Sequence, residues 1–596
     1  MTEAITVRTS NLPRTAPKIH FQVAMPQPSS HLFEVSLQVS GWSASALDLK
    51  LPVWTPGSYL VREYAKNLQD FFVQAGNTIL PWRKLAKNHW QVGTNGVSEI
   101  TVHYRVFANE LSVRTNHLDS SHGYFNPAAL CFYIPEFTEQ PIKITVVPPQ
   151  ANWQIFTPLP AVPGMKNTFE AADFDTLVDS PFEVGTHQFY QFEVLGKSHE
   201  LAIWGRGNAN PERMIEDIKK IIQVEAEIYQ GLPYERYLFL LHLSSNIAGG
   251  LEHKYACSLI YPRFNFRKQD KYESFMQLVA HEFFHLWNVK RLRPKGLEKF
   301  DYDRENYTSS LWFCEGTTSY YDLQIPMRAG IYDAKTFLQN LSKEITLLQT
   351  KAGRKVQPVS ESSFDAWIKL YRRDANSDNC QISYYLKGEL ISFLLDLLIR
   401  ERQGNQRSLD DVMRYMWENF GKAEIGFTGE ELQEAIELVA GKDLSDFFSS
   451  YIDGVEELPF DEYLAPFGLR LQADIDADQP PYIGVKAKAQ NGKQKIEFVE
   501  INSPAQIAGV SADDELLAID GIRVNADQLN DRLKDYQPGD TIHLSIFHQD
   551  ELQTLPVTLA DPQPNNYKIV AVENPNQTQQ ENFQAWLGIP LTKLTN

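Results

Sequence analysis

The stretch LVAHEFFHLWNVKRLRP, residues 278–294, decides how the rest of the chain is interpreted. It places two histidines and a glutamate, His281, Glu282 and His285, among aromatic and aliphatic residues. The apolar residues around them recur at helical spacing, and Pro294 marks a stop. The sequence therefore predicts a largely buried helix of about five turns.

The spacing of these three polar residues indicates a metal site. His281 and His285 are four residues apart, so a helix presents both rings on one face, one turn apart. Such a pair of imidazoles can bind one cation, whereas two buried histidines without partners would be costly. Glu282 follows the first histidine, at the place where zinc peptidases carry their general base. We predict one zinc ion per chain at this site.

A third ligand is expected in the stretch LWFCEGTTSYY, residues 311–321. Catalytic zinc takes three protein ligands and keeps a fourth position for water. Glu315 is a carboxylate in an aromatic helical context, and a metal is a suitable partner for it; a salt bridge to Arg291 or Arg293 is the alternative. Cys314 is set aside because adjacent helical positions diverge by about 100° and because two histidines with a glutamate are the commoner hydrolytic set.

Hydrophobic periodicity divides the chain into three parts. Residues 18–205 read as strands, with many β-branched and aromatic residues, and predict an all-β domain. Residues 210–451 follow helical periods, beginning with a helix that opens at Asn210 and Pro211. Short strands and turns return over residues 459–559. The remaining C-terminal sequence is polar and rich in Pro, Asn and Gln, which predicts a loosely structured strap.

The motifs resemble a known group of enzymes. HExxH followed by W-x-x-E-G is the gluzincin pattern, shared with thermolysin and aminopeptidase N. HEFFHLWNVKRLRP together with LWFCEGTTSYY resembles the glycyl aminopeptidase family of zinc metallopeptidases, and the resemblance covers nearly the whole chain. It implies a multidomain α+β protein. Its expected parts are an N-terminal β-sheet domain (1–205), a thermolysin-like, mostly helical catalytic domain (206–458), a PDZ domain (459–562) and a C-terminal tail (563–596).

Two further stretches acquire roles through this resemblance. NIAGGLEHKYA, residues 246–256, resembles in position the G-x-M-E-N exopeptidase stretch of aminopeptidase N, which lies on an edge strand. Gly249, Gly250, Glu252 and His253 are then substrate-binding residues, and the Glu252 carboxylate pairs with the ammonium group of the substrate. The sequence departs from that pattern where histidine replaces asparagine and Gly-Leu replaces Ala-Met. Without the resemblance the stretch reads as a Gly-Gly turn with a surface glutamate.

The second stretch is YYLKG, residues 384–388, which matches the Y-x-K-G of aminopeptidase N relatives. Tyr385 is then a catalytic residue that donates a hydrogen bond to the oxyanion. Tyr384 is the alternative, because a helix can aim only one of the two rings inward. Without the resemblance, both read as packing tyrosines at the start of a core helix.

The expected activity follows from these parts. Zinc would activate a water molecule, Glu282 would act as general base, and peptides with a free N-terminus would lose a small first residue, glycine and then alanine. Two alternatives stay open: a zinc endopeptidase, and a catalytically silent PDZ protein that binds peptides. The intact zinc motif argues against the silent protein, and Glu252 argues against the endopeptidase.

The C-terminal strands resemble a PDZ domain of the bacterial protease type. Its carboxylate-binding loop is matched by Tyr482, Ile483, Gly484 and Val485, where backbone amides cradle a peptide C-terminus. Capture of a peptide and a purely structural role both remain open for this domain.

Composition excludes some classes of partner. The net charge of −19 disfavours nucleic acid and anionic membranes, because long-range attraction would have the wrong sign.

The four cysteines are far apart and are expected to be reduced, buried thiols. The N-terminal sequence has no apolar core of a signal peptide, and no apolar run is long enough to span a bilayer, so a cytoplasmic protein is expected.

Overall fold

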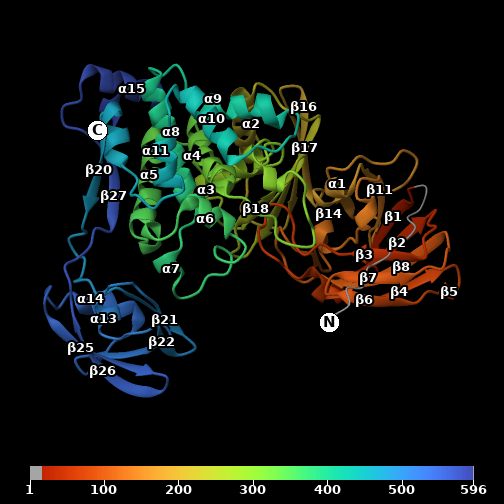
Figure 1. Cartoon of the computed structure of the whole chain (residues 1–596), viewed down its shortest axis with the longest axis horizontal. Coiled ribbons are helices and arrows are strands. Elements are labelled where there is room, and N and C mark those ends of the chain that lie inside the picture. Colours follow the sequence, from red (N-terminus) through yellow and green to blue (C-terminus); the bar gives the residue numbers. More distant parts are fainter. Residues whose placement is uncertain (1–15, 595–596) are drawn as a thin grey trace, which may run out of the picture. The chain divides into compact units, whose positions relative to one another are not determined.

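The computed structural model describes residues 16–594 and is shown in Figure 1. The chain divides into two compact units. The first contains residues up to 307 together with 419–426, and the second contains 308–418 together with the residues from 427 onward. Each unit is described by itself.

The first unit begins with a β-rich region. A seven-stranded sheet has the order β13-β11-β1-β2-β8-β4-β5, and a three-stranded sheet has the order β3-β7-β6. In β2 every second residue is buried, from Phe33 to Val39, as expected for a strand with one face on a core. The strands are β1 (Lys18–Ala24), β2 (Leu32–Ser40), β3 (Ala46–Lys50), β4 (Leu68–Ala75), β5 (Thr78–Ile79), β6 (Trp82–Ala86), β7 (His89–Gly93), β8 (Glu99–Phe107), β11 (Ile142–Val147) and β13 (Thr168–Ala171).

Two more sheets complete the first unit. A four-stranded sheet has the order β12-β14-β10-β9, and a five-stranded sheet has the order β15-β16-β17-β19-β18. A buried apolar cluster joins side chains of both sheets, including Tyr124 and Leu240. The strands are β9 (His117–Leu118), β10 (His122–Phe125), β12 (Gln154–Phe156), β14 (Phe182–Gly185), β15 (Gln188–Val194), β16 (Lys197–Trp204), β17 (Arg236–Ser244), β18 (Gly249–Glu252) and β19 (Ala256–Pro262).

The five-stranded sheet crosses the expected domain boundary. β16 pairs in parallel with β17, so residues on both sides of position 205 belong to one sheet. The helices of this unit are α1 (Phe174–Val178), α2 (Pro211–Tyr229) and α3 (Gln269–Phe284). The helix predicted from Asn210 onward is confirmed: the Asn210 side chain caps α2, and the helix buries Met214, Ile218 and Ile222 on one face.

The second unit begins as a helical region (Figure 1). A π-helix (Trp312–Thr317) runs directly into α4 (Thr318–Arg328). The other helices are α5 (Ala334–Gln349), α6 (Val359–Phe364), α7 (Ser377–Cys380), α8 (Tyr384–Arg402), α9 (Leu409–Met416), α10 (Gly429–Ala440), α11 (Ser445–Phe447) and α12 (Phe460–Leu464). α8 is buried nearly all round, from Leu386 to Ile399, which marks it as the central helix of this region.

The C-terminal strands form a separate small sheet of order β21-β22-β23-β25-β26, with β24 paired to β23. Its elements are β21 (Val485–Gln490), β22 (Lys493–Val499), α13 (Pro504–Ile507), β23 (Glu515–Ile519), β24 (Ile522–Arg523), α14 (Leu529–Leu533), β25 (Thr541–His548) and β26 (Glu551–Thr558). The predicted multidomain α+β class, with a β-rich start, a helical middle and a terminal β domain, is confirmed.

The prediction of a loosely structured tail is wrong. Within 563–594, β27 (Asn566–Ala571) pairs antiparallel with β20 (Leu469–Asp474), and α15 (Gln577–Leu587) follows. A capping box of Asn576 and Gln579 starts this helix, which buries Phe583 and Trp586. A few well-placed apolar residues therefore order a segment whose overall composition is polar.

All four cysteines are free; three of them are buried as predicted, whereas Cys380 is partly exposed. No described helix is both long enough and apolar enough to cross a membrane. The cytoplasmic location stays a prediction.

Candidate metal centre

Helix α3 carries the HExxH residues at its C-terminal end. It starts at Gln269 and ends at Phe284, with His285 as the cap, so it begins and ends earlier than the predicted helix. Beyond the cap the backbone hydrogen bonds are of mixed type: the Trp287 N–H donates three residues back, to Phe284, and the Lys290 N–H donates five residues back, to His285, at 2.9 Å. The chain after His285 therefore runs in irregular turns, because these bonds interrupt the regular α-helical ladder.

The rings of His281 and His285 lie side by side, with centroids 4.6 Å apart and planes nearly perpendicular. The Nδ1 atom of His285 lies 2.7 Å from the Asn288 carbonyl oxygen, which only an N–H can satisfy. This bond leaves the lone pair on Nε2, the atom that a metal would need. Asn288 was not identified from the sequence, because a backbone acceptor leaves no side-chain signal.

Glu282 lies between these histidines in the chain and is buried, with 5% of its surface exposed. Burial raises the pKa of the Glu282 carboxyl to about 7. The negative charge of the nearby Glu252 adds to this rise, whereas His281 and His285 oppose it. Its Oε2 atom has no hydrogen-bond partner within residues 16–594. A carboxyl group in this state can accept and return a proton near neutral pH.

Strand β18 runs directly against the Glu282 carboxyl. A Cβ atom on Gly250 would lie 2.2 Å from Oε1 of Glu282, so a side chain at this point of the strand would push the Glu282 carboxyl group aside. The Gly250 carbonyl accepts a hydrogen bond from Nη2 of Arg114 at 3.0 Å. Arg114 was missed by the sequence reasoning, because it lies 136 positions earlier in an irregular segment.

Glu252 ends β18 and is also buried, at 4% exposure. One carboxylate oxygen from each of Glu252 and Glu282, together with a ring nitrogen of His285, lies within a 4.8 Å cluster. Gly57 has a positive φ of 84°, and a Cβ there would come within 2.4 Å of the Glu252 carboxylate. The reading of Glu252 as a surface residue of a turn is therefore excluded.

His253 does not share this environment. Its Nδ1 lies 3.4 Å from Oδ1 of Asp179, and the buried Lys290 ammonium lies 2.5 Å from the same oxygen. Although burial alone would raise the pKa of Asp179, the Lys290 ammonium and the contact with His253 hold that pKa well below its usual range. Asp179, His253 and Lys290 thus form a buried polar cluster next to the end of β18.

The second unit contains the other two candidate residues. Glu315 is buried in the π-helix, a helix type often found at functional sites. Burial raises the pKa of Tyr385, and the negative charge of Glu315 raises it further, which places the two side chains near each other. In the first unit, Arg291 and Arg293 donate hydrogen bonds to backbone carbonyls.

The two adjacent tyrosines differ in exposure. Tyr384 is fully buried, whereas Tyr385 keeps part of its surface. The Tyr371 hydroxyl lies 3.3 Å from the Tyr385 hydroxyl and 3.5 Å from that of Tyr384. Of the two, Tyr385 is the better placed to meet a substrate.

The PDZ loop residues line one groove. Tyr482, Ile483, Gly484 and Val485 lie around it with Phe498 and Leu533. Gly484 has a φ of 80°, and a Cβ there would come within 2.2 Å of the Ser503 Cβ. β21, which follows the loop, is the edge strand of its sheet, so a further strand has room to pair with it.

The donor set fits zinc. Two neighbouring imidazoles are presented on one helix, one of them with its tautomer fixed by a backbone carbonyl, and a buried carboxyl group stands beside them. Together with the α+β fold, these features define a zinc metallopeptidase of the aminopeptidase class.

Comparison with known proteins identifies the family. Family models match as the Peptidase M61 N-terminal domain over residues 20–186, as M61 glycyl aminopeptidase over 274–391 and as a PDZ domain over 481–559. The crystal structure of an aminopeptidase N family protein from Idiomarina loihiensis is 32% identical, with a TM-score of 0.89; the match covers 96% of this chain and 100% of that one. The chain belongs to the M61 glycyl aminopeptidase family.

More remote likenesses add no further argument. An M1 zinc metallopeptidase from Deinococcus radiodurans is 12% identical with a TM-score of 0.47, covering 75% of this chain and 96% of that one. A variant of that protein, bound to a Tyr-Ser-Ala substrate, matches at 13% identity over the same shares, with the same TM-score. A search of curated proteins gave no match.

Proposed function

We propose that this zinc aminopeptidase removes small N-terminal residues, glycine and then alanine, from peptides with a free amino group. The observation that carries the proposal is the pair of buried carboxyl groups, Glu252 and Glu282, held together where β18 meets α3. One carboxylate is suited to bind the substrate ammonium and the other to transfer a proton.

The proposed zinc ligands are His281, His285 and Glu315. The two histidines have the helical spacing that the metal requires, and the tautomer of His285 leaves its Nε2 lone pair available. Glu315 is supported by its burial and by its position in the W-x-x-E-G motif. When bound, zinc supplies a Lewis acid that polarises the scissile carbonyl and lowers the pKa of water.

Residues of the chain carry out the proton transfer and stabilise the developing negative charge. Glu282 takes a proton from the attacking water at its carboxylate and returns it to the leaving amine. Tyr385 donates its hydroxyl hydrogen to the carbonyl oxygen as negative charge develops there. Gly250 leaves room for the base, because any side chain at this position would displace the Glu282 carboxylate.

Glu252 gives the proposed enzyme its exopeptidase character. Its Oε1 is buried and has no hydrogen-bond partner in the described part of the chain. A substrate ammonium would supply the missing charge-assisted bonds, whereas an acetylated N-terminus would leave the carboxylate buried and unpaired. This cost disfavours the endopeptidase alternative.

The proposed role of the PDZ domain is to bind the C-terminus of a peptide in the groove beside Gly484 and β21. The free edge of β21 supports this role, as does the presence of Lys486 and Lys534 in the groove lining. Binding of a peptide with a free C-terminus, but not of its amide, would support it; equal binding of the two would contradict it.

The activity is tested with glycyl- and leucyl-p-nitroanilide beside their N-acetylated forms, with and without a chelator. We expect chelator-sensitive cleavage of the free-amine glycyl substrate above all, no cleavage by Glu282→Gln, and a selective loss for Glu252→Gln. Cleavage of acetylated substrates would contradict the aminopeptidase. A protein with bound zinc but no turnover would support the silent peptide-binding alternative.

A further inference from the structure

Four histidines gather around two carboxylates in the first unit, on elements other than α3. The innermost group consists of His122 at the start of β10, Glu183 in β14, His187 after β14 and His242 in β17. The side chains of all four are at most 1% exposed. We call these four residues the histidine–glutamate cluster. The sequence analysis did not detect it, because its members are spread over 121 positions without a motif.

The Glu183 carboxylate stands at the centre of this cluster. Its Oε2 lies 2.6 Å from Nε2 of His242, and its Oε1 lies 2.7 Å from Nε2 of His187. Nε2 of His122 lies 3.8 Å from the same Oε1. Within residues 16–594, every ion pair of Glu183 is with a histidine ring. The buried negative charge of Glu183 therefore has imidazoles as its partners, and no lysine or arginine among the described residues.

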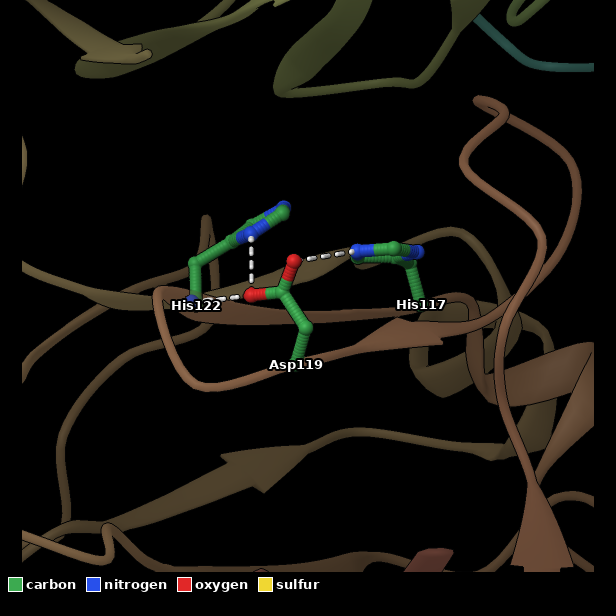
Figure 2. Close-up of side chains that lie close together, drawn as sticks. All are labelled: His117, Asp119 and His122. Atoms are coloured by element: carbon green, nitrogen blue, oxygen red, sulfur yellow. Dashed lines mark hydrogen bonds and ion pairs between the residues drawn. The ribbon is translucent and has the colours of Figure 1, made fainter. Parts of the chain in front are cut away.

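The second carboxylate, Asp119, lies near Nδ1 of His122. Figure 2 shows Asp119 between His117 and His122. One Asp119 oxygen lies 3.7 Å from Nδ1 of His122, and the other lies 3.3 Å from Nε2 of His117. Asp119 is itself held by the Ser121 backbone N–H at 2.7 Å. The negative charge of Asp119 near Nδ1 of His122 favours a proton on that nitrogen and leaves the lone pair on Nε2.

That lone pair faces the cluster. Nε2 of His122 is buried and has no hydrogen-bond partner among the described residues, yet it points towards a carboxylate oxygen. Two electron-rich atoms in a dry interior repel each other unless a cation lies between them. In metal sites, a carboxylate commonly lies against one ring nitrogen of a histidine and orients the other nitrogen towards the metal ion.

We propose that the histidine–glutamate cluster binds a divalent transition-metal ion of the zinc class, through His122, Glu183 and His242. One ligand atom from each of the three lies within 4.8 Å of the other two. Metal bonds of about 2.0–2.2 Å place tetrahedral ligand atoms about 3.3 Å apart. Small side-chain shifts are therefore needed, together with release of the proton that Nε2 of His242 donates to Glu183 at 2.6 Å when no ion is bound. Imidazole nitrogens favour zinc and its neighbours over magnesium or calcium. His187 donates to Glu183 and holds that carboxylate in place.

The position of the cluster gives the ion a structural role. β10 and β14 belong to the four-stranded sheet, whereas β17 belongs to the five-stranded sheet that also contains β18. The ion would therefore join these two sheets. The indole of Trp204 stacks on the His122 ring at 3.8 Å and helps to close the site. Because all three proposed ligands are buried, a peptide substrate has no access to the ion, which supports a structural role.

The test counts metal ions without relying on activity. The double variant His281→Ala/His285→Ala removes the proposed ligands on α3, and the metal content of the folded protein is then measured by mass spectrometry. Cobalt is next added to the metal-free double variant, because its visible absorption reports coordination by nitrogen and oxygen. We expect one zinc equivalent and one bound cobalt per chain.

Two further variants in the same background locate the ion. Addition of His122→Gln or of His242→Gln is expected to lower bound metal at least tenfold. His199→Gln is the matched control, because His199 is a buried histidine of β16 bonded to the Tyr234 hydroxyl, and its loss is expected to leave binding unchanged. The proposal is overturned if the folded double variant, whose cluster is intact, binds neither zinc nor cobalt. It is also overturned if both cluster variants retain the metal.

Discussion

Gly250→Ala tests whether strand β18 sets the position of Glu282, the proposed general base. The added Cβ would lie 2.2, 2.3 and 2.4 Å from Oε1, Cδ and Cγ of Glu282. Non-bonded carbon atoms prefer about 3.5–4.0 Å, so the carboxyl group must move by more than about 1 Å. A misplacement of about 1 Å can cost roughly 100-fold in rate, or about 2.7 kcal/mol in the barrier.

The assay is kcat/KM for glycyl-p-nitroanilide, measured together with zinc content and Tm. We expect the rate to fall roughly 100-fold while zinc stays bound, because the histidines are not touched. Gly429→Ala is the matched control: it lies at the start of α10, and no atom lies within 4 Å of its added Cβ. The reasoning is refuted if Gly250→Ala keeps the wild-type kcat/KM while Glu282→Gln abolishes activity.

Three other predictions address separate parts of the chain. Tyr385→Phe is expected to lower kcat roughly 100-fold by removal of the proposed oxyanion donor, whereas Tyr384→Phe should leave kcat unchanged; equal effects in steady-state assays would contradict the choice between them. Asp179→Asn leaves the Lys290 ammonium buried without its carboxylate and should lower the free energy of unfolding by about 3–5 kcal/mol in urea titrations at pH 7. The pKa of Asp179 is depressed in the folded protein, so the ionised carboxylate stabilises the fold above the usual carboxyl pKa of about 4, and this stabilisation is lost as the pH falls below that value. The free energy of unfolding of Asp179→Asn should therefore fall less steeply with acid than that of the wild type. Gly484 has a φ of 80°, and an added Cβ would lie 2.2 Å from the Ser503 Cβ. Gly484→Ala should therefore destabilise the PDZ domain by at least about 1 kcal/mol, and an unchanged transition in calorimetry would refute this.

The sequence predicted best what local spacing determines. His281 and His285 share a helix face because their separation matches one turn, and the alternation in the N-terminal strands matches the period of a sheet. Contacts between distant segments were not predictable in this way. The approach of Gly250 to Glu282, the bond from Arg114 to β18 and the histidine–glutamate cluster all join residues far apart in the chain.

The tail shows a second limit. Its polar composition predicted little structure, because average composition reports how much apolar surface is available but not where it falls. Phe583 and Trp586 lie three positions apart on α15, so even a mostly polar helix presents them on one side. The capping box at Asn576 and Gln579 was the available signal for this helix.

The π-helix and α8 cross at two glycines in the second unit. A Cβ on Gly316 would lie 2.5 Å from the Gly388 backbone, and a Cβ on Gly388 would lie 2.5 Å from the Trp312 carbonyl oxygen. Across the same crossing, the Thr317 and Ser392 hydroxyls are 2.8 Å apart. The glycines that end the W-x-x-E-G and Y-x-K-G motifs are thus required by packing alone. Each motif joins one residue with a proposed role in the chemistry to a glycine required for helix contact, so a relative that has lost activity would still keep both glycines as long as it folds. The presence of these glycines in a sequence is evidence of the fold, whereas Glu315 and Tyr385 bear on the proposed activity.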